Sequence, residues 1–230
     1  MDAVAIITGP RTGAGHLVSL LDNVEAVAHS GGLFADGFAD AAGRLDRAER
    51  DAHAAGKSML VFTLTSAAPR DVVAREILDR PGMRAIIVMR RQVDAYVSLA
   101  KAMALGAWRD TDLTNVKVKL DAARFADWMA GQEAWYAHWR RWLERRGLPV
   151  PVIRYETQIQ GLPADTVLRR FSACLSQLGL TLPIPAELPH AGLVRQDRER
   201  TVAFKVRNWP DFSRGLSERG IDKRAFGYPI

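Results

Sequence analysis

Short continuous runs of apolar residues alternate with stretches of helical periodicity, and this alternation restricts the fold more than any other feature of the chain. The apolar runs cover residues 3–8, 58–65, 84–89 and 151–155, with a shorter candidate at 24–28. Runs without polar alternation are typical of strands that are covered on both faces. Helical periodicity between them covers residues 12–22, 69–79, 92–106 and 164–178. The pattern predicts a three-layer α/β fold, with a central parallel sheet of about four to five strands flanked by helices.

Length and composition predict a single domain over residues 1–230. The chain has 230 residues, of which 48% are hydrophobic, and no apolar run reaches the length of about 18 residues that an integral membrane segment needs. The first residues lack the pattern of a signal peptide, so we expect a cytoplasmic protein. The single cysteine, Cys174, lies in an apolar pattern and is expected to fill the core. The sequence is compatible with an oligomer but does not define one.

The basic character of the chain favours an anionic partner. The formal net charge is +6, with Lys and Arg spread over several segments. No zinc-finger spacing, basic zipper or aromatic ribonucleoprotein motif accompanies these cations, so we expect no nucleic acid as partner. A phosphorylated small molecule is the favoured ligand. No cluster of His, Cys and Asp has metal-ligand spacing, so no metal is expected.

An aromatic stripe marks the longest predicted helix, over residues 112–146. Its members share one helical face: Phe125, Trp128, Trp135, Trp139 and Trp142. This face is predicted to pack against the core, whereas Tyr136 and His138 lie off the stripe and are predicted to be partly exposed. Predicted loops cover the Gly-rich residues 30–37 and the Pro-rich residues 181–196.

A loop of small residues, TGPRTGAG, follows the first apolar run. Its glycines allow the backbone to approach an anion, and the predicted helix after it directs free N–H groups to the same place. The spacing is P-loop-like only, because Gly15 and His16 stand where the nucleotide motif has Lys and Ser or Thr. The candidate anion-binding residues of this loop are Arg11, Thr12, Gly13, Ala14, Gly15 and His16.

A second segment, IIVMRRQVDAYVSL, leaves a predicted strand and enters a helix. Arg90 closes the strand, and Ser98 follows eight residues later, about two helical turns on. A strand-end Arg and a helix-borne Ser are able to converge on one phosphate, with charge-assisted hydrogen bonds from the guanidinium. Asp94 is predicted to cap or start the helix.

These segments resemble those of the sulfotransferases that use 3′-phosphoadenosine 5′-phosphosulfate (PAPS), with bacterial carbohydrate-type members most similar. Residues 10–13 resemble the family's 5′-phosphosulfate loop, and Arg90 with Ser98 resembles its 3′-phosphate pair. VIRYE (152–156) and VRNW (206–209) resemble two further family segments, in the same order along the chain. The resemblance implies PAPS as co-substrate, adenosine 3′,5′-bisphosphate as product and no metal.

The resemblance also implies a reaction, in which a sulfuryl group moves from PAPS to a hydroxyl of a saccharide, a glycolipid or another small molecule. Arg11 would stabilise charge that develops on the transferred group. The remaining donor-binding candidates are Tyr155, Lys205 and Arg207. The last two would close over the donor as a cationic flap.

The general base of the family has no counterpart in this sequence. Leu64 stands where many members have His, and Gly32 stands where bacterial carbohydrate-type members have Glu. A hydroxyl acceptor needs a proton acceptor within hydrogen-bond reach. The candidates in the segments nearest the presumed sulfate are His16, His29 and Asp36.

Two other functions stay open on the sequence alone. A P-loop kinase or nucleotide hydrolase would share the fold, but it would need Lys with Ser or Thr in the loop and an acidic strand end. A nucleotide-binding module without catalysis is favoured by Ala14 and Gly15, which lack the hydroxyl groups of the family loop, and by the missing base.

Overall fold

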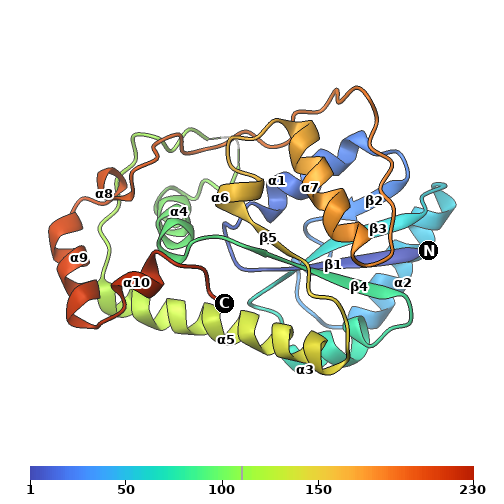
Figure 1. Ribbon diagram of the computed structural model, residues 1–230, viewed down its shortest axis with the longest axis horizontal. Coiled ribbons are helices and arrows are strands. Elements are labelled where there is room, and N and C mark those ends of the chain that lie inside the picture. The colour runs from blue at the N-terminus through green and yellow to red at the C-terminus, as the bar shows by residue number, and fades with distance from the viewer. Residues whose placement is uncertain (110) are drawn as a thin grey trace.

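Five parallel strands form the centre of the computed structural model, which describes residues 1–109 and 111–230. Their order across the sheet is β2-β3-β1-β4-β5, and helices flank the sheet (Figure 1). The predicted α/β fold is therefore confirmed, and the shorter candidate strand lies slightly later than expected. The strands are β1 (Asp2–Thr8), β2 (Val27–Ser30), β3 (Met59–Thr65), β4 (Met83–Met89) and β5 (Val152–Arg154).

Five of the ten α-helices in the described residues lie within the periodic segments of the sequence, whereas the helices at 41–54, 155–158, 202–205, 209–218 and 222–225 were not predicted. A 3-10 turn, η1 (Leu20–Asn23), continues the first helix, and a π-helix, η2 (Val73–Leu78), continues the third. In the described part of the chain, no helix is both long enough and apolar enough to cross a bilayer. The α-helices are α1 (Ala14–Ser19), α2 (Ala41–Ala54), α3 (Arg70–Val72), α4 (Gln92–Leu105), α5 (Ala122–Arg145), α6 (Tyr155–Gln158), α7 (Ala164–Ser176), α8 (Val202–Lys205), α9 (Trp209–Glu218) and α10 (Asp222–Ala225).

Helices cover both faces of the sheet, because side chains alternate between the two faces along each strand. Successive residues of β1 point to opposite faces of the sheet, and both sets are buried. Val4 and Ile6 pack with α1 and α7, and Cys174 fills this core as predicted. Ala5 and Ile7 pack with α2, η2 and the second half of α5. Burial on both faces explains why the strands appear in the sequence as continuous apolar runs.

A third apolar cluster lies beside the sheet and fixes the elements around its carboxyl edge. It joins α4 to the first half of α5, to α9 and to α10. Val118 and Val206 belong to this cluster and also pair as an isolated parallel bridge. The segments before α5 and after α8 are thereby held side by side.

The long helix is shorter than the sequence predicted. It begins at Ala122 rather than near residue 112, because the Asp121 side chain accepts a hydrogen bond from the Arg124 N–H and caps it. The aromatic stripe packs inward as predicted. Tyr136 was predicted to be partly exposed, and this is wrong: its side chain is buried among those of the stripe.

Candidate anion-binding site

The loop between β1 and α1 lies beside the end of β4. The two strands are parallel neighbours, and Thr8 at the end of β1 is in register with Val88. Carboxyl ends of parallel strands form the usual ligand-binding edge of open α/β sheets. The sheet thereby brings together the two predicted phosphate-binding segments, whose arginines are 79 residues apart in the sequence.

The loop backbone has two residues in the left-handed region. The angle φ is +59° at Arg11 and +89° at Gly13, both in the left-handed region. Left-handed residues within a turn create backbone nests that bind anions. Within the described residues, the N–H groups of residues 11–16 donate to no backbone carbonyl, so they are available to a ligand.

The base of the loop is fixed by α5. The Gly9 N–H donates to the Tyr136 hydroxyl over 2.6 Å, and that hydroxyl donates to the Val88 carbonyl over 2.9 Å. A Cβ at Gly9 would lie 2.4 Å from Oε1 of Gln132, so only glycine fits there without displacing that side chain. The Thr12 hydroxyl is buried against the Thr8 hydroxyl, so it is directed into the loop rather than toward solvent.

Arg11 makes three hydrogen bonds, all to neutral acceptors. Its Nε donates to Ser98 Oγ over 3.0 Å, and its two terminal nitrogens donate to the Trp108 carbonyl over 3.0 Å and to Gln196 Oε1 over 2.6 Å. Burial lowers the pKa of Arg11, and the neighbouring charge of Arg90 lowers it further. In the described part of the chain, no carboxylate forms an ion pair with this guanidinium, so its charge is available to an anion.

Arg90 lies against the loop and is only partly satisfied. One terminal nitrogen donates to the Arg11 carbonyl over 3.0 Å, and the guanidinium carbon lies 4.3 Å from the centre of the Tyr155 ring. Glu156 lies 3.7 Å from Arg90 Nε, beyond hydrogen-bond distance. This nitrogen is buried and has no hydrogen-bond partner among the described residues.

Gly13 allows Tyr155 to reach the loop. A Cβ at this position would lie 2.3 Å from Cδ2 of the tyrosine ring. The left-handed backbone independently favours glycine at this residue. The structure therefore brings together the predicted donor-binding residues Arg11, Gly13, Arg90, Ser98 and Tyr155.

Lys205 lies in the same region, within a buried charge network that the sequence did not predict. Its Nζ is 3.4 Å from Asp197 Oδ2, and the fully buried Lys101 is 2.7 Å from the same oxygen. Burial lowers the pKa of Lys205, whereas Asp197 and Asp94 counter this effect. Two lysines share one carboxylate, so the network carries excess positive charge.

A sequence signal for this network exists on α4. Asp94, Ser98 and Lys101 are spaced four and three residues apart and are all buried, so they form a polar stripe on one face of the helix. Such a stripe in an otherwise apolar helix indicates buried polar contacts. Gln196 and the Trp108 carbonyl had no comparable signal, because they lie in segments without regular structure.

Helix α4 begins at Gln92, and Asp94 does not cap it. The N-cap residue is Arg91, and it makes no side-chain capping hydrogen bond. Asp94 lies in the first turn, where a carboxylate interacts favourably with the helix dipole, and its Oδ2 is 3.1 Å from Arg91 Nε. The part of the prediction that made Asp94 a cap is therefore wrong.

The three candidate bases have different surroundings. His16 Nδ1 lies 2.9 Å from the Leu193 carbonyl, and burial lowers the pKa of this histidine. His29 is paired with Asp22 at 2.8 Å, on β2 at the edge of the sheet. Asp36 is 90% exposed and lies 3.3 Å from Arg44. Of the three, His16 is the one that lies on α1, the helix that follows the Arg11 loop.

The other candidates contribute little side-chain chemistry. Ala14 is buried, and Gly15 has space for a Cβ, with Leu193 at 3.7 Å. Arg207 has an exposed side chain, and its N–H donates to the Val118 carbonyl. Within the described residues, no group of His, Cys, Asp or Glu side chains is arranged to hold a metal ion.

No model of a known protein family matches the chain, and no curated protein matches it in sequence. Two guanidinium groups, a buried lysine, free loop N–H groups and hydroxyl donors surround one edge of the sheet. This set of donors fits a ligand with more than one phosphate or sulfate group.

Proposed function

We propose that this protein binds PAPS and transfers its sulfuryl group to a hydroxyl of a saccharide, a glycolipid or a small metabolite. The observation that carries the proposal is the convergence of Arg11, Arg90 and Ser98: Arg11 bonds to Ser98 over 3.0 Å, and Arg90 bonds to the Arg11 carbonyl over 3.0 Å. Their spacing in the sequence is that of the family the chain resembles.

The unused hydrogen-bond donor of Arg90, whose charge Glu156 offsets only from 3.7 Å, supports an anionic ligand. Arg11 has only neutral partners among the described residues, and Arg90 keeps a buried nitrogen without a hydrogen bond. A buried cationic donor that lacks an acceptor is unfavourable until an anion supplies one. A phosphate group at Arg90 and Ser98 would provide the missing acceptor.

Ligand binding would exchange partners at Ser98. Its hydroxyl now accepts from Arg11, and the same hydroxyl is proposed to donate to the 3′ phosphate. The loop N–H groups and Arg11 would then hold the phosphosulfate end. Tyr155, stacked on Arg90 and packed against Gly13, would fix the distance between the two phosphate subsites.

The proposed reaction is an in-line displacement at sulfur. The acceptor oxygen forms a bond to sulfur while the bond from sulfur to the bridging oxygen of the phosphosulfate breaks, and adenosine 3′,5′-bisphosphate leaves. Arg11 would stabilise the charge that develops on the leaving phosphate. His16 is the proposed acceptor of the hydroxyl proton. Burial lowers its pKa, so the imidazole stays neutral to a lower pH than that of an exposed histidine.

The test is sulfuryl transfer from labelled PAPS to a panel of sugar and phenolic hydroxyl acceptors. Arg11→Ala should lower kcat by about 100-fold or more, because the contact strengthens only in the transition state. Arg140→Ala, which removes an arginine paired with Glu144 near the end of α5, is the matched control and should keep native turnover. A variant that raised only the KM for PAPS would contradict the role assigned to Arg11.

A second candidate is a binding module without catalysis. It is favoured by the pairing of His29 with Asp22 and of Asp36 with Arg44. It is also favoured by Ala14 and Gly15, which add no hydroxyl groups to the loop. This candidate predicts tight binding of adenosine 3′,5′-bisphosphate together with no transfer to any acceptor at any pH. The transfer assay therefore separates the two proposals.

A further inference from the structure

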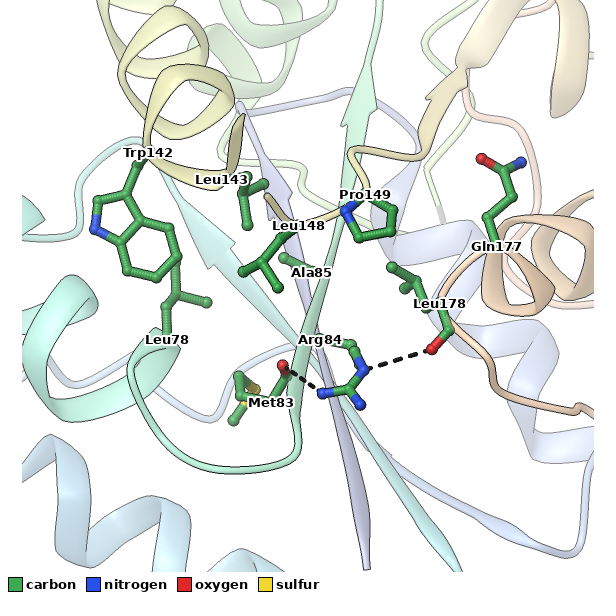
Figure 2. A pocket seen from close by; sticks show the side chains of 10 residues that line it. All are labelled: Leu78, Met83, Arg84, Ala85, Trp142, Leu143, Leu148, Pro149, Gln177 and Leu178. Atoms are coloured by element: carbon green, nitrogen blue, oxygen red, sulfur yellow. Dashed lines mark hydrogen bonds between the residues drawn. The ribbon is translucent and has the colours of Figure 1, made fainter. Parts of the chain in front are cut away.

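A cavity lies at the opposite edge of the sheet from the candidate anion-binding site. It has a volume of about 310 Å³ and opens between the start of β4, the end of α5 and the segment after α7 (Figure 2). Its walls are mainly apolar, and their main members are Leu78, Trp142, Leu143, Leu148, Pro149 and Leu178. Ligand pockets begin at about this size, so the cavity has room for one small molecule.

Arg84 is the cationic member of this cavity. Figure 2 shows its guanidinium at one rim, between the backbone oxygens of Met83 and Leu178. The two hydrogen bonds to these oxygens are long, 3.2 Å and 3.4 Å, and within the described residues the second terminal nitrogen has no partner. No described carboxylate forms an ion pair with Arg84.

The neighbouring charges do not compensate Arg84. Asp79 follows Leu78, but it is paired with Arg146 at 2.9 Å. The Arg146 guanidinium lies 3.7 Å from the centre of the Trp142 ring, so this pair covers the outer side of the apolar wall. The cavity therefore combines an apolar lining with one cation whose donors are not all used.

We propose that this cavity binds an amphipathic monocarboxylate with an unbranched apolar chain of medium length. The carboxylate would accept from the free terminal nitrogen of Arg84, in a charge-assisted hydrogen bond. The chain would lie along Leu148, Leu143 and Trp142. A nucleotide does not fit this lining, because one cation and apolar walls offer no partners for several phosphates.

The cavity and the candidate anion-binding site occupy different ends of β4. The cavity is lined by Met83, Arg84 and Ala85 at the start of the strand, whereas Arg90 follows its end. Arg90 comes six residues after Arg84, which corresponds to about 20 Å along an extended strand. The inference is independent of the proposed function and holds whether or not the protein transfers sulfuryl groups.

The test is calorimetric titration of the full chain with octanoate, 1-octanol and octylamine. Octanoate should bind at least about ten times more tightly than 1-octanol, since a charge-assisted hydrogen bond contributes this much or more. Octylamine should bind most weakly. Arg84→Met, which keeps a long apolar side chain without the charge, should make octanoate and 1-octanol equal.

A second variant tests the apolar wall. Leu148 is partly exposed, so Leu148→Asp should leave the fold intact, as circular dichroism would verify, and it should abolish octanoate binding by repulsion. A crystal with 8-bromooctanoate should show bromine near Trp142. The inference is overturned if octanoate binds no more tightly than 1-octanol, or if Arg90→Met weakens octanoate binding while Arg84→Met does not.

Discussion

Arg11 has an unfavourable left-handed backbone conformation, and its guanidinium donates hydrogen bonds to three neutral acceptors. It is one of two described non-glycine residues with positive φ, the other being Asp40. The left-handed region costs an L-residue roughly 1–2 kcal/mol, so the surrounding structure has to hold Arg11 there. Strained backbone conformations of this kind are found most often at functional sites. Its three neutral acceptors come from segments 87, 97 and 185 residues away.

Two substitutions at Arg11 separate the backbone from the side chain. Arg11→Ala and Arg11→Gly both remove the guanidinium, but only glycine accepts the left-handed backbone without strain. Arg11→Gly should therefore be more stable than Arg11→Ala by about 1 kcal/mol, as urea unfolding would measure. Both variants should keep most of the thermal stabilisation by adenosine 3′,5′-bisphosphate, because Arg11 is proposed to act mainly in the transition state. Equal stability of the two variants would contradict the conformation assigned to residue 11.

His16 makes stability depend on pH in a defined direction. Burial lowers its pKa below the ordinary value of 6.5, so the unfolded chain binds a proton at higher pH than the native protein does. The stability associated with neutral His16 is present above about pH 6.5 and is lost as the pH falls below it. The free energy of unfolding should therefore fall more steeply between pH 6.5 and 5 in the native protein than in His16→Gln. Parallel pH profiles would show that His16 is not the group responsible.

At the scale of elements, α5 determines where the phosphate loop lies. Tyr136 crosses from α5 to the sheet and bonds to both Gly9 and Val88, so one side chain fixes the loop to the end of β4. The helix was predicted from its aromatic stripe, but the hydrogen bonds of Tyr136 were not. A tyrosine outside the stripe carries no sequence pattern that indicates which backbone groups it contacts. Burial also raises the pKa of Tyr136, which keeps its hydroxyl protonated.

Tyr136→Phe tests this connection. Loss of the hydroxyl leaves the Gly9 N–H and the Val88 carbonyl without this partner in a buried place, which should cost about 2–4 kcal/mol of unfolding free energy. Tyr96→Phe is the matched control, since Tyr96 is a half-buried tyrosine whose ring packs on Phe125 and Trp128. It should change stability by less than about 0.5 kcal/mol. A Tyr136→Phe variant as stable as the control would refute the role of this hydroxyl.

At the scale of the whole molecule, the sequence predicted the sheet better than the contacts at its edge. Continuous apolar runs identified the five strands because both faces of the sheet are covered. The loop, Arg90 and Ser98 were also located, since each follows or faces a strand end. The partners of these residues could not be predicted: Gln196 and Asp197 lie in a segment without helix or strand, and tertiary packing alone brings them to α4 and the loop.

The start of α5 was also predicted incorrectly, because contacts between distant segments determine it. Apolar residues at 113, 116, 118 and 120 have a spacing like that of a helix start, but the segment turns at residues 114–115 and Val118 then pairs with Val206. Asn208 fixes it further, with hydrogen bonds of 3.0 Å and 2.8 Å to the backbone of Leu120. Such contacts between distant segments override local periodicity, and no local pattern reports them.

We propose that the carboxyl edge of the sheet binds adenosine 3′,5′-bisphosphate through Arg90. Calorimetric titration of the native protein, Arg90→Ala and Arg84→Ala with this ligand tests it most directly. Arg90→Ala should weaken binding by about 30-fold or more, because it removes a charge-assisted contact to a phosphate, whereas Arg84→Ala, which removes a cation at the opposite edge, should bind like the native protein. A folded Arg90→Ala variant with native affinity, or a native protein that binds ATP with Mg²⁺ in preference to the bisphosphate, would contradict the account.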